Sequence, residues 1–367
     1  MTTIGVAGAG TMGAGIAALA AASGMRTLLY DPDPEALARA PDGPAAAADL
    51  DALAVCDVVI EAAPEDLEVK RTLFARLAAI VEPDCVLATN TSSLSVTALA
   101  AGLPQPERVV GMHFFNPPAK MRLLELVAGD ASGAAALAAA RSAGEAMGKH
   151  VIEAADGPGF IVNRCNRPFS LEALRMVQER IATPEQIDRI CRTAGGFRMG
   201  PFELMDLVGI DVGFAVSRSF YEQSFGEPRW RPSMLAARLV AAGRLGRKSG
   251  RGWYEYPPGP PRDAATGEPP LDPRDVAAEP VLERIVVQLV NEACFALGEG
   301  IGSAADIDAG MVLGLNHPRG PLEWGELIGP ARVVEVLRRL REEHGDAYRT
   351  APWLTRAVRE GRTTLAP

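Results

Sequence analysis

Residues 3–24 read TIGVAGAGTMGAGIAALAAASG and contain the feature that decides the fold of the first half of the chain. A short apolar segment leads into a glycine turn, and an Ala- and Leu-rich run follows and closes at Gly24. Gly8, Gly10 and Gly13 form a G-x-G-x-x-G pattern between the expected strand and helix. The first glycine of this pattern lets the chain turn, the second lets the backbone approach a pyrophosphate, and the third lets the helix pack on the strand. We therefore expect a dinucleotide-binding unit; a glycine turn that serves packing alone is the alternative.

The next apolar segment, MRTLLYD, ends in Asp31, 18 residues after Gly13. A carboxylate at the end of the second strand can accept hydrogen bonds from a ribose diol. The same negative charge would repel a 2′-phosphate, so Asp31 favours NAD over NADP.

The remainder of the first half alternates between strand and helix patterns. We expect a helix at 66–80 and strands within 57–65, 85–93, 108–118, 123–128 and 149–154. This alternation predicts a Rossmann-type, doubly wound parallel α/β sheet over residues 1–155, with ligands bound at the carboxyl ends of the strands. Asn90, Ser92 and His113 are expected just past such strand ends, on the cofactor side.

The second half of the chain contains an internal sequence repeat. Residues 181–209 (IATPEQIDRICRTAGGFRMGPFELMDLVG) align without a gap on residues 301–329 (IGSAADIDAGMVLGLNHPRGPLEWGELIG), at a constant offset of 120. The aligned identities are Ile181/Ile301, Ile187/Ile307, Asp188/Asp308, Gly200/Gly320, Pro201/Pro321, Glu203/Glu323, Leu207/Leu327 and Gly209/Gly329. We expect two copies of an all-α helical domain, 156–256 and 280–367, joined by a Pro-rich linker at 257–279.

Composition limits the classes of function. The chain has 367 residues, enough for two or three domains, and its net charge of -9 argues against a nucleic-acid partner. The apolar runs are too short to span a membrane, and the chain enters an apolar strand without a leading signal peptide. The five cysteines are scattered, which favours a reducing, cytoplasmic environment. The four histidines lie far apart in the sequence, so no metal site is expected.

Five stretches, taken in order, resemble the 3-hydroxyacyl-CoA dehydrogenase family: GAGTMGAGIA, NTSSL, HFFNPPAKMRLLELV, DGPGFIVNR and GRLGRKSGRGWYEY. The resemblance covers residues 1–255 apart from one short segment. It implies NAD as cofactor, an acyl-CoA substrate and a role in fatty acid metabolism of the β-oxidation type. It also implies that His113 is the general base, that Glu125 orients it, and that Ser92 and Asn163 bind the substrate oxygen. The residues expected at the cofactor are Gly8, Gly10, Thr11, Met12, Gly13, Asp31, Glu65, Lys70 and Asn90.

The oxidation of an alcohol requires a base, an acid that orients it and hydrogen-bond donors to the oxygen, independently of the resemblance. The alternative for His113 is a buried histidine that hydrogen-bonds to a backbone carbonyl. Oxidation of a secondary alcohol sends a hydride to nicotinamide and a proton to a base. An imidazole titrates near pH 6.5 and a hydroxyl about nine units higher, so complete deprotonation first would cost about 12 kcal/mol. Proton and hydride must therefore leave nearly together. A carboxylate such as Glu125 fixes the histidine tautomer and stabilises the imidazolium, and donors from Ser92 and Asn163 stabilise charge on the oxygen.

One segment departs from the family pattern. Family members carry a long helical hairpin after the second strand, which helps to bind the CoA nucleotide, but only 25 residues separate Asp31 from Asp57. We expect a single helix there. We therefore expect one of two carriers for the acyl group: CoA with weak adenine contacts, or a pantetheine on a carrier protein.

The favoured interpretation is an NAD-dependent dehydrogenase of (S)-3-hydroxyacyl-CoA with short or dicarboxylic acyl chains. The alternatives are the same reaction on a carrier-bound thioester and a non-catalytic NAD-binding protein of structural use. At the offset of 120, Asn163 falls on Glu283, so the second helical copy cannot rebuild the site. We expect that copy to stand in for a partner subunit, giving a monomer with an internal pseudo-dimer; a homodimer is the alternative.

Overall fold

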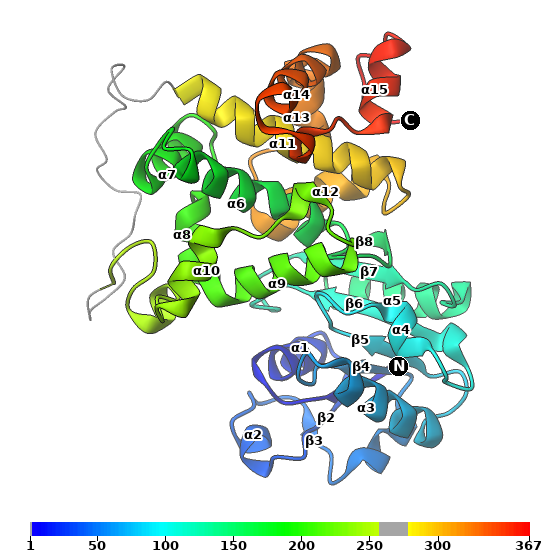
Figure 1. The fold of residues 1–367 in the computed structure, drawn as a ribbon. Coiled ribbons are helices and arrows are strands. Elements are labelled where there is room, and N and C mark those ends of the chain that lie inside the picture. The colour runs from blue at the N-terminus through cyan, green and yellow to red at the C-terminus, as the bar shows by residue number, and fades with distance from the viewer. Residues whose placement is uncertain (1, 257–277) are drawn as a thin grey trace. The chain divides into compact units, whose positions relative to one another are not determined.

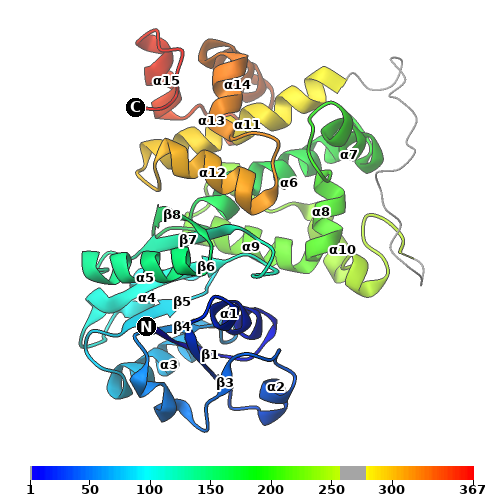
Figure 2. The ribbon, with the colours of Figure 1, turned by 180° about the vertical axis from the view of Figure 1, so that it is seen from behind.

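The computed structural model describes residues 2–256 and 278–367. The chain forms two compact units (Figures 1 and 2): Met1–Ile161 with Gly300–Gly314, and Val162–Glu299 with Leu315–Pro367. The linker predicted at 257–279 lies outside the described residues except for its last two positions.

The first unit is built on an eight-stranded sheet with the spatial order β3-β2-β1-β4-β5-β6-β7-β8. Its strands are β1 (Thr3–Ala7), β2 (Arg26–Tyr30), β3 (Ala45–Ala46), β4 (Val58–Glu61), β5 (Val86–Thr89), β6 (Val109–Phe114), β7 (Leu123–Ala128) and β8 (His150–Ala155). Its helices are α1 (Thr11–Ala22), α2 (Pro34–Ala38), α3 (Leu67–Ile80), α4 (Val96–Ala100), α5 (Ala134–Ala146) and most of α12 (Ala304–Leu315), with 3-10 turns at Leu50–Val55 and Pro106–Arg108. The predicted Rossmann-type architecture is confirmed.

The sequence of the strands explains why they occupy the centre of this unit. Every residue of β1, β4, β5 and β6 is buried, as expected for strands covered on both faces. The covering helices α1 and α5 contribute alanines to one core cluster with these strands, so small side chains let helix and sheet approach closely.

Two strands run against the predicted direction. β7 pairs antiparallel with β6 and β8 pairs parallel with β7, whereas the strands from β1 to β6 pair parallel with their neighbours among themselves. The sheet is mostly parallel, and the predicted direction was wrong for β7 and β8 alone. The connection at 115–122 is too short for the crossover that a parallel pair requires. The turn-back also places His113 inside β6, directly opposite Glu125 on β7, and not past the strand end as expected.

The shortened segment after the second strand contains one α-helix, as expected. It holds the five-residue α2, the two-residue strand β3 and the 3-10 turn Leu50–Val55. β3 adds an edge strand parallel to β2 that the Ala- and Pro-rich sequence did not predict.

The second unit is helical. Its elements are α6 (Val162–Gln178), α7 (Pro184–Thr193), α8 (Pro201–Val208), α9 (Ile210–Gln223), α10 (Met234–Ala241), α11 (Ala278–Gly298), α13 (Pro321–Ile328), α14 (Pro330–His344) and α15 (Pro352–Arg359), with 3-10 turns at Pro228–Trp230, Arg247–Ser249 and Asp346–Tyr348. At the offset of 120, α6 to α10 correspond in order to α11 to α15. One counterpart, α12, groups instead with the first unit, where the Ala155 amide donates to the Ile301 carbonyl at 2.8 Å. The sequence did not predict that contact.

The two repeats meet through reciprocal ion pairs between α6 and α11. Arg164 lies 2.9 Å from Glu292, and Arg284 pairs with Glu172. Arg284 is Arg164 plus 120 and Glu292 is Glu172 plus 120, so each pair is the other with the roles of the two copies exchanged. A second carboxylate joins each arginine at 2.7 Å, Glu299 at Arg164 and Glu179 at Arg284. This exchange is the signature of a two-fold, self-complementary interface.

Because His317 is buried, we expect the folded protein to lose stability in mild acid. It is buried between the rings of Phe169 and Phe197, with centroids 5.6 and 5.0 Å away, and burial lowers its pKa from 6.5 to about 4. The folded state therefore favours the neutral ring, so stability is complete above pH 6.5 and is lost as the pH falls towards 4. The loss should reach about 3 kcal/mol.

Urea unfolding at pH 7 and at pH 4.5 checks this prediction. The wild type should lose more unfolding free energy between the two values than His317→Gln does. Replacement of the exposed His150 by Gln serves as the control, which should follow the wild type. Equal losses in the wild type and His317→Gln would contradict the prediction.

The five cysteines are all buried and free of disulfides, and burial raises the pKa of Cys56 to about 11.

In the described part of the chain, no helix is both long and apolar enough for a membrane span. Within residues 2–256 and 278–367, no cluster of three or more His, Cys, Asp or Glu side chains is suited to a metal ion.

Candidate active site

The three glycines of the first turn meet different surroundings. Gly8 has a φ of +117°, and a Cβ there would lie 2.6 Å from the Ala62 carbonyl oxygen. A Cβ on Gly13 would lie 1.8 Å from the Gly8 carbonyl oxygen, so α1 can approach the turn only without a side chain. A Cβ on Gly10 would meet nothing within 4 Å. The open side at Gly10 leaves room for a ligand against the backbone.

The N-terminus of α1 begins at this open side. Thr11 and Met12 are its first residues, Thr11 is exposed, and the first amides of the helix point towards the turn. An anionic group such as a pyrophosphate is stabilised by those amides and by the helix dipole. The residues present therefore fit a dinucleotide.

Asp31 stands at the carboxyl end of β2 and braces the same turn. Its Oδ2 accepts a hydrogen bond from the Ala9 amide at 2.6 Å, and its Oδ1 accepts from the Asp33 amide at 2.8 Å. Both oxygens keep a further lone pair, so the predicted contact with a ribose remains chemically available.

Lys70 lies on α3 and is only 1% exposed. Its Nζ lies 2.6 Å from Glu61 Oε1 and 3.3 Å from both Glu65 Oε2 and the Ala63 carbonyl oxygen. All three ammonium donors therefore have protein partners. Lys70 binds the end of β4 to the loop after it, and its contact with the dinucleotide stays a prediction.

Glu65 organises the loop that carries Ser92. Its Oε1 accepts hydrogen bonds from the Thr91 hydroxyl at 2.6 Å, the Ser93 hydroxyl at 3.0 Å and the Ser92 amide at 3.2 Å. Burial would raise the pKa of Glu65, but the hydrogen bond from Thr91 and the charge of Lys70 outweigh it and lower the pKa. Glu65 is thus an ionised brace that fixes the position of Ser92.

His113 and Glu125 form a buried pair across β6 and β7. His113 Nδ1 lies 2.6 Å from Glu125 Oε2, and Glu125 Oε1 accepts a hydrogen bond from the Ile161 amide at 3.1 Å. The carboxylate can only accept, so the hydrogen bond assigns the proton of the neutral ring to Nδ1 and leaves a lone pair on Nε2. The ring is held between Phe115 and Phe160, with centroids 4.6 and 5.9 Å away. This arrangement fixes the ring and leaves Nε2 chemically able to accept a proton.

The remaining predicted residues occupy two places. Asn90 follows β5, and its Oδ1 accepts a hydrogen bond from the Phe114 amide at 2.8 Å, which ties the end of β5 to the end of β6. Ser92 follows two residues later and is half-buried. Asn163 is the second residue of α6 and belongs to the second unit.

Sequence patterns did not reveal the residues that support the site. Glu61, Thr91 and Ser93 orient Lys70, Glu65 and the loop of Ser92, and the Ile161 amide holds Glu125. A buried acid at the end of DVVIE was the available signal for Glu61, because an acid inside a central strand needs a partner. No sequence signal identifies a backbone amide such as that of Ile161.

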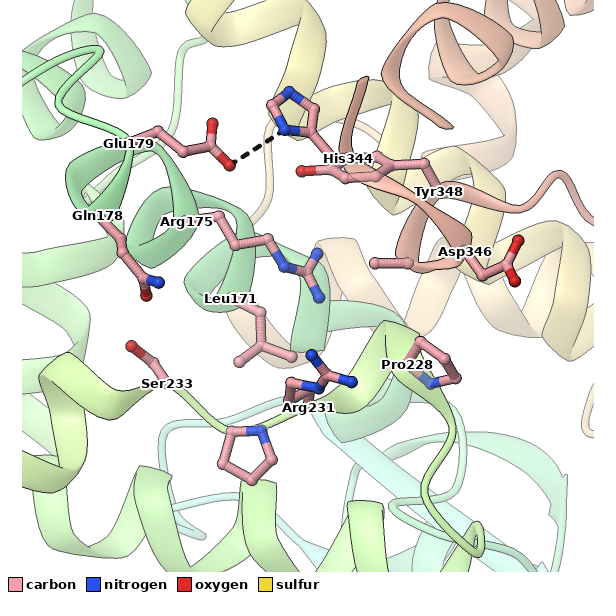
Figure 3. Close-up of a pocket in the computed structure, with 12 residues that line it drawn as sticks. Leu171, Arg175, Gln178, Glu179, Pro228, Arg231, Ser233, His344, Asp346 and Tyr348 are labelled. Atoms are coloured by element: carbon pink, nitrogen blue, oxygen red, sulfur yellow. Dashed lines mark ion pairs between the residues drawn. The ribbon is translucent and has the colours of Figure 1, made fainter. Parts of the chain in front are cut away.

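A pocket of about 510 Å³ lies elsewhere, within the second unit (Figure 3). The guanidinium groups of Arg175 and Arg231 face into it, and His344 Nδ1 lies 3.5 Å from Glu179 at its edge. None of its lining residues was predicted as a site residue. This pocket is distinct from the set around His113.

Family models match nearly the whole chain. The model described as 3-hydroxyacyl-CoA dehydrogenase, NAD binding domain, matches residues 3–45 and 42–157, and the model of the C-terminal domain matches residues 159–256 and again 281–366. The chain belongs to the 3-hydroxyacyl-CoA dehydrogenase family. It is an NAD-dependent oxidoreductase that acts on 3-hydroxyacyl-CoA. The first model matches in two pieces that meet inside the shortened segment between Asp31 and Asp57.

Relatives of two lengths resemble this dehydrogenase. The 3-hydroxyadipyl-CoA dehydrogenase of Escherichia coli K12 is 36% identical over 94% of both chains. The probable 3-hydroxybutyryl-CoA dehydrogenase of Deinococcus radiodurans is 37% identical over 69% of this chain and 99% of its own. A crystal structure of 3-hydroxybutyryl-CoA dehydrogenase from Escherichia coli K12 superimposes with a TM-score of 0.90, at 35% identity and over 98% of this chain and 99% of that one. The shorter relative fits the sheet domain with one helical copy, and the longer ones fit both copies.

Proposed function

We propose that the dehydrogenase oxidises the 3-hydroxyl of (S)-3-hydroxyacyl-CoA with a short acyl chain, either straight or carrying a terminal carboxylate, and that His113 is the general base. The hydrogen bond between His113 Nδ1 and Glu125 Oε2 carries this proposal, because it directs the lone pair of Nε2 away from the carboxylate. Bound NAD supplies the hydride acceptor. Its holders are Gly8, Gly10, Thr11, Met12, Gly13 and Asp31, with Glu65, Lys70 and Asn90 fixing the neighbouring loops.

Residues of the chain itself take up the proton that the 3-hydroxyl loses. Nε2 of His113 takes it from the 3-hydroxyl, and Glu125 stabilises the imidazolium that results. The Ser92 hydroxyl and the Asn163 amide donate hydrogen bonds to the substrate oxygen as negative charge develops on it. Phe115 and Phe160 keep the ring in one orientation, so little reorganisation accompanies the reaction.

A substrate panel tests the proposal. NADH formation is followed by absorbance with (S)-3-hydroxybutyryl-CoA, (S)-3-hydroxyhexanoyl-CoA and (S)-3-hydroxyadipyl-CoA. We expect turnover with at least one of them, and kcat/KM for the (R) enantiomers should be lower by orders of magnitude. Absence of turnover with every CoA ester would contradict the proposal.

The shortened segment favours a second candidate, a thioester carried on the pantetheine of a carrier protein. α2 has five residues and none of them is buried, so it offers little surface for an adenine. A comparison of CoA, pantetheine and carrier-protein esters of one acyl group distinguishes the candidates. Higher kcat/KM with the carrier-loaded ester than with the CoA ester would favour the second candidate.

We also propose the domain division 1–155, 156–256 and 280–367, in which the third part takes the place of a partner subunit. The exchanged ion pairs Arg164–Glu292 and Arg284–Glu172 support this, since such pairs are typical of two-fold subunit contacts. The intact protein should sediment as a monomer, and cleavage within 257–277 should leave the fragments associated. Separation of the fragments into folded halves would contradict the pseudo-dimer.

A further inference from the structure

Arg167 is a cation that pairs with no carboxylate in the described part of the chain. It lies on α6, its Nη1 donates to the Ser217 hydroxyl at 3.3 Å, and its guanidinium stands over the Phe220 ring at 5.2 Å. Its Nε is buried and has no hydrogen-bond acceptor among the described residues. Burial lowers the pKa of Arg167 to about 10. The surroundings therefore hold the side chain in place and leave its charge uncompensated.

The buried arginines of this unit are compensated, whereas Arg167 is half-buried. Arg164 and Arg284 each pair with two glutamates, and Arg229 pairs with Glu227 and Glu292. Burial would lower the pKa of Arg164 and Arg284, but the carboxylates outweigh it and raise the pKa, which is the opposite of the shift at Arg167. In a chain with nine more acids than bases, an arginine with a buried Nε and no acid beside it contrasts with these three, and an acidic ligand would explain the difference.

The repeat shows that the fold does not require this charge. At the offset of 120, Arg167 corresponds to Val287, and Ser217 corresponds to Leu337. Val287 and Leu337 are both fully buried. The same helix position therefore accepts an apolar side chain in the copy that lacks the counterpart of Asn163.

Arg167 follows Asn163 by four residues, so both lie on the same face of α6, about 6 Å apart along the axis. Asn163 is proposed to bind the oxygen on C3 of the substrate. In a six-carbon acyl chain, C6 lies three bonds beyond C3, each about 1.5 Å long. A carboxylate at C6 therefore extends about one helical turn from the C3 oxygen, which is the spacing between Asn163 and Arg167.

We propose that Arg167 binds the terminal carboxylate of a dicarboxylic 3-hydroxyacyl chain and selects such substrates over straight chains. This inference rests on the proposed function of the same site. The planar guanidinium presents parallel donors that match a carboxylate, and the uncompensated charge gains a partner only when that carboxylate is bound. A methyl group at the same position leaves the charge of the guanidinium uncompensated.

The test compares (S)-3-hydroxyadipyl-CoA with (S)-3-hydroxyhexanoyl-CoA, which differ only in carboxylate against methyl at C6. Arg167→Met should lower kcat/KM for the adipyl ester by about 100-fold and leave that for the hexanoyl ester unchanged or higher. Arg167→Lys should lie between the wild type and Arg167→Met. Arg218→Met, on exposed α9 surface, is the control and should keep the wild-type selectivity.

A second measurement needs no variant. The wild type should be inhibited more strongly by adipyl-CoA than by hexanoyl-CoA, neither of which has a 3-hydroxyl. An equal loss of activity on both substrates in Arg167→Met, or equal inhibition by the two esters, would overturn the role of Arg167. Wild-type turnover of the hexanoyl ester alone would overturn this inference and leave the proposed function intact. Absence of turnover with these two esters and with (S)-3-hydroxybutyryl-CoA would overturn both.

Discussion

Replacement of His113 by Ala should lower kcat for oxidation of the 3-hydroxyl by about 1000-fold and change NADH affinity by less than about twofold. Nε2 of the ring is the nitrogen that Glu125 does not engage, so we expect it to take the proton, and Glu125 is fully buried. Gly8, Gly10 and Gly13 lie at the turn between β1 and α1, whereas His113 lies in β6, so cofactor binding is expected to survive. NADH absorbance gives the rate, and NADH fluorescence gives the affinity.

Two further variants make this result specific. Glu125→Gln should lower kcat less than His113→Ala, because the ring remains but loses the charge that stabilises the imidazolium. His150→Ala removes an exposed histidine on β8 and should leave kcat unchanged. A His113→Ala protein that keeps more than a tenth of the wild-type kcat would show that another group takes the proton.

Replacement of Glu172 by Gln should lower the unfolding free energy of the dehydrogenase by about 3–5 kcal/mol. Glu172 is fully buried and accepts hydrogen bonds from Arg175, Arg284 and Tyr348. Burial would raise the pKa of Glu172, but the charges of Arg175 and Arg284 outweigh it and lower the pKa, which marks the carboxylate as ionised. Its loss leaves two guanidinium groups with less compensation in a buried interface. Urea unfolding measures the change.

The repeat provides a matched test. Glu292 is the counterpart of Glu172 and pairs with Arg164 and Arg229, so Glu292→Gln should destabilise the protein by a similar amount. Glu342→Gln removes an exposed pair with Arg338 and should cost less than about 1 kcal/mol. Similar small losses in all three variants would contradict the view that the exchanged pairs hold the two copies together.

The local patterns of the first half predicted most of its fold. The strand–turn–helix at 3–24 and seven of the eight strands lie where hydrophobic runs and glycines indicated. The direction of β7, and with it that of β8, was missed, because a buried strand has the same hydrophobic pattern in either direction and only the short connection at 115–122 decides the pairing. That pairing is what brings Glu125 to His113, so the site depends on a feature that periodicity does not encode.

The central residues of the site could also be predicted from the sequence, but the residues that hold them in position could not. His113 and Glu125 were predicted together, and the structure places them 2.6 Å apart. Lys70 and Glu65 were expected to line the dinucleotide, which stays a prediction; the sequence did not indicate that they also contact Glu61 and the loop of Thr91. The sequence does not distinguish Arg167, because an arginine in a helix is usually solvated. Its buried Nε and its lack of a carboxylate partner among the described residues distinguish it, and both depend on how the helices pack.

The most direct test of the central claim is NADH formation in a single turnover, with substrate carrying deuterium at C3, in H₂O and in D₂O. Because complete deprotonation of the hydroxyl before hydride loss is too costly, His113 must accept the proton as the hydride leaves. Deuterium at C3 should therefore slow the reaction in both solvents. The solvent effect, which is the ratio of the rate in H₂O to the rate in D₂O, should be the same for the deuterated and the undeuterated substrate. A solvent effect that vanishes with the deuterated substrate would contradict the account, since proton and hydride would then leave in separate steps.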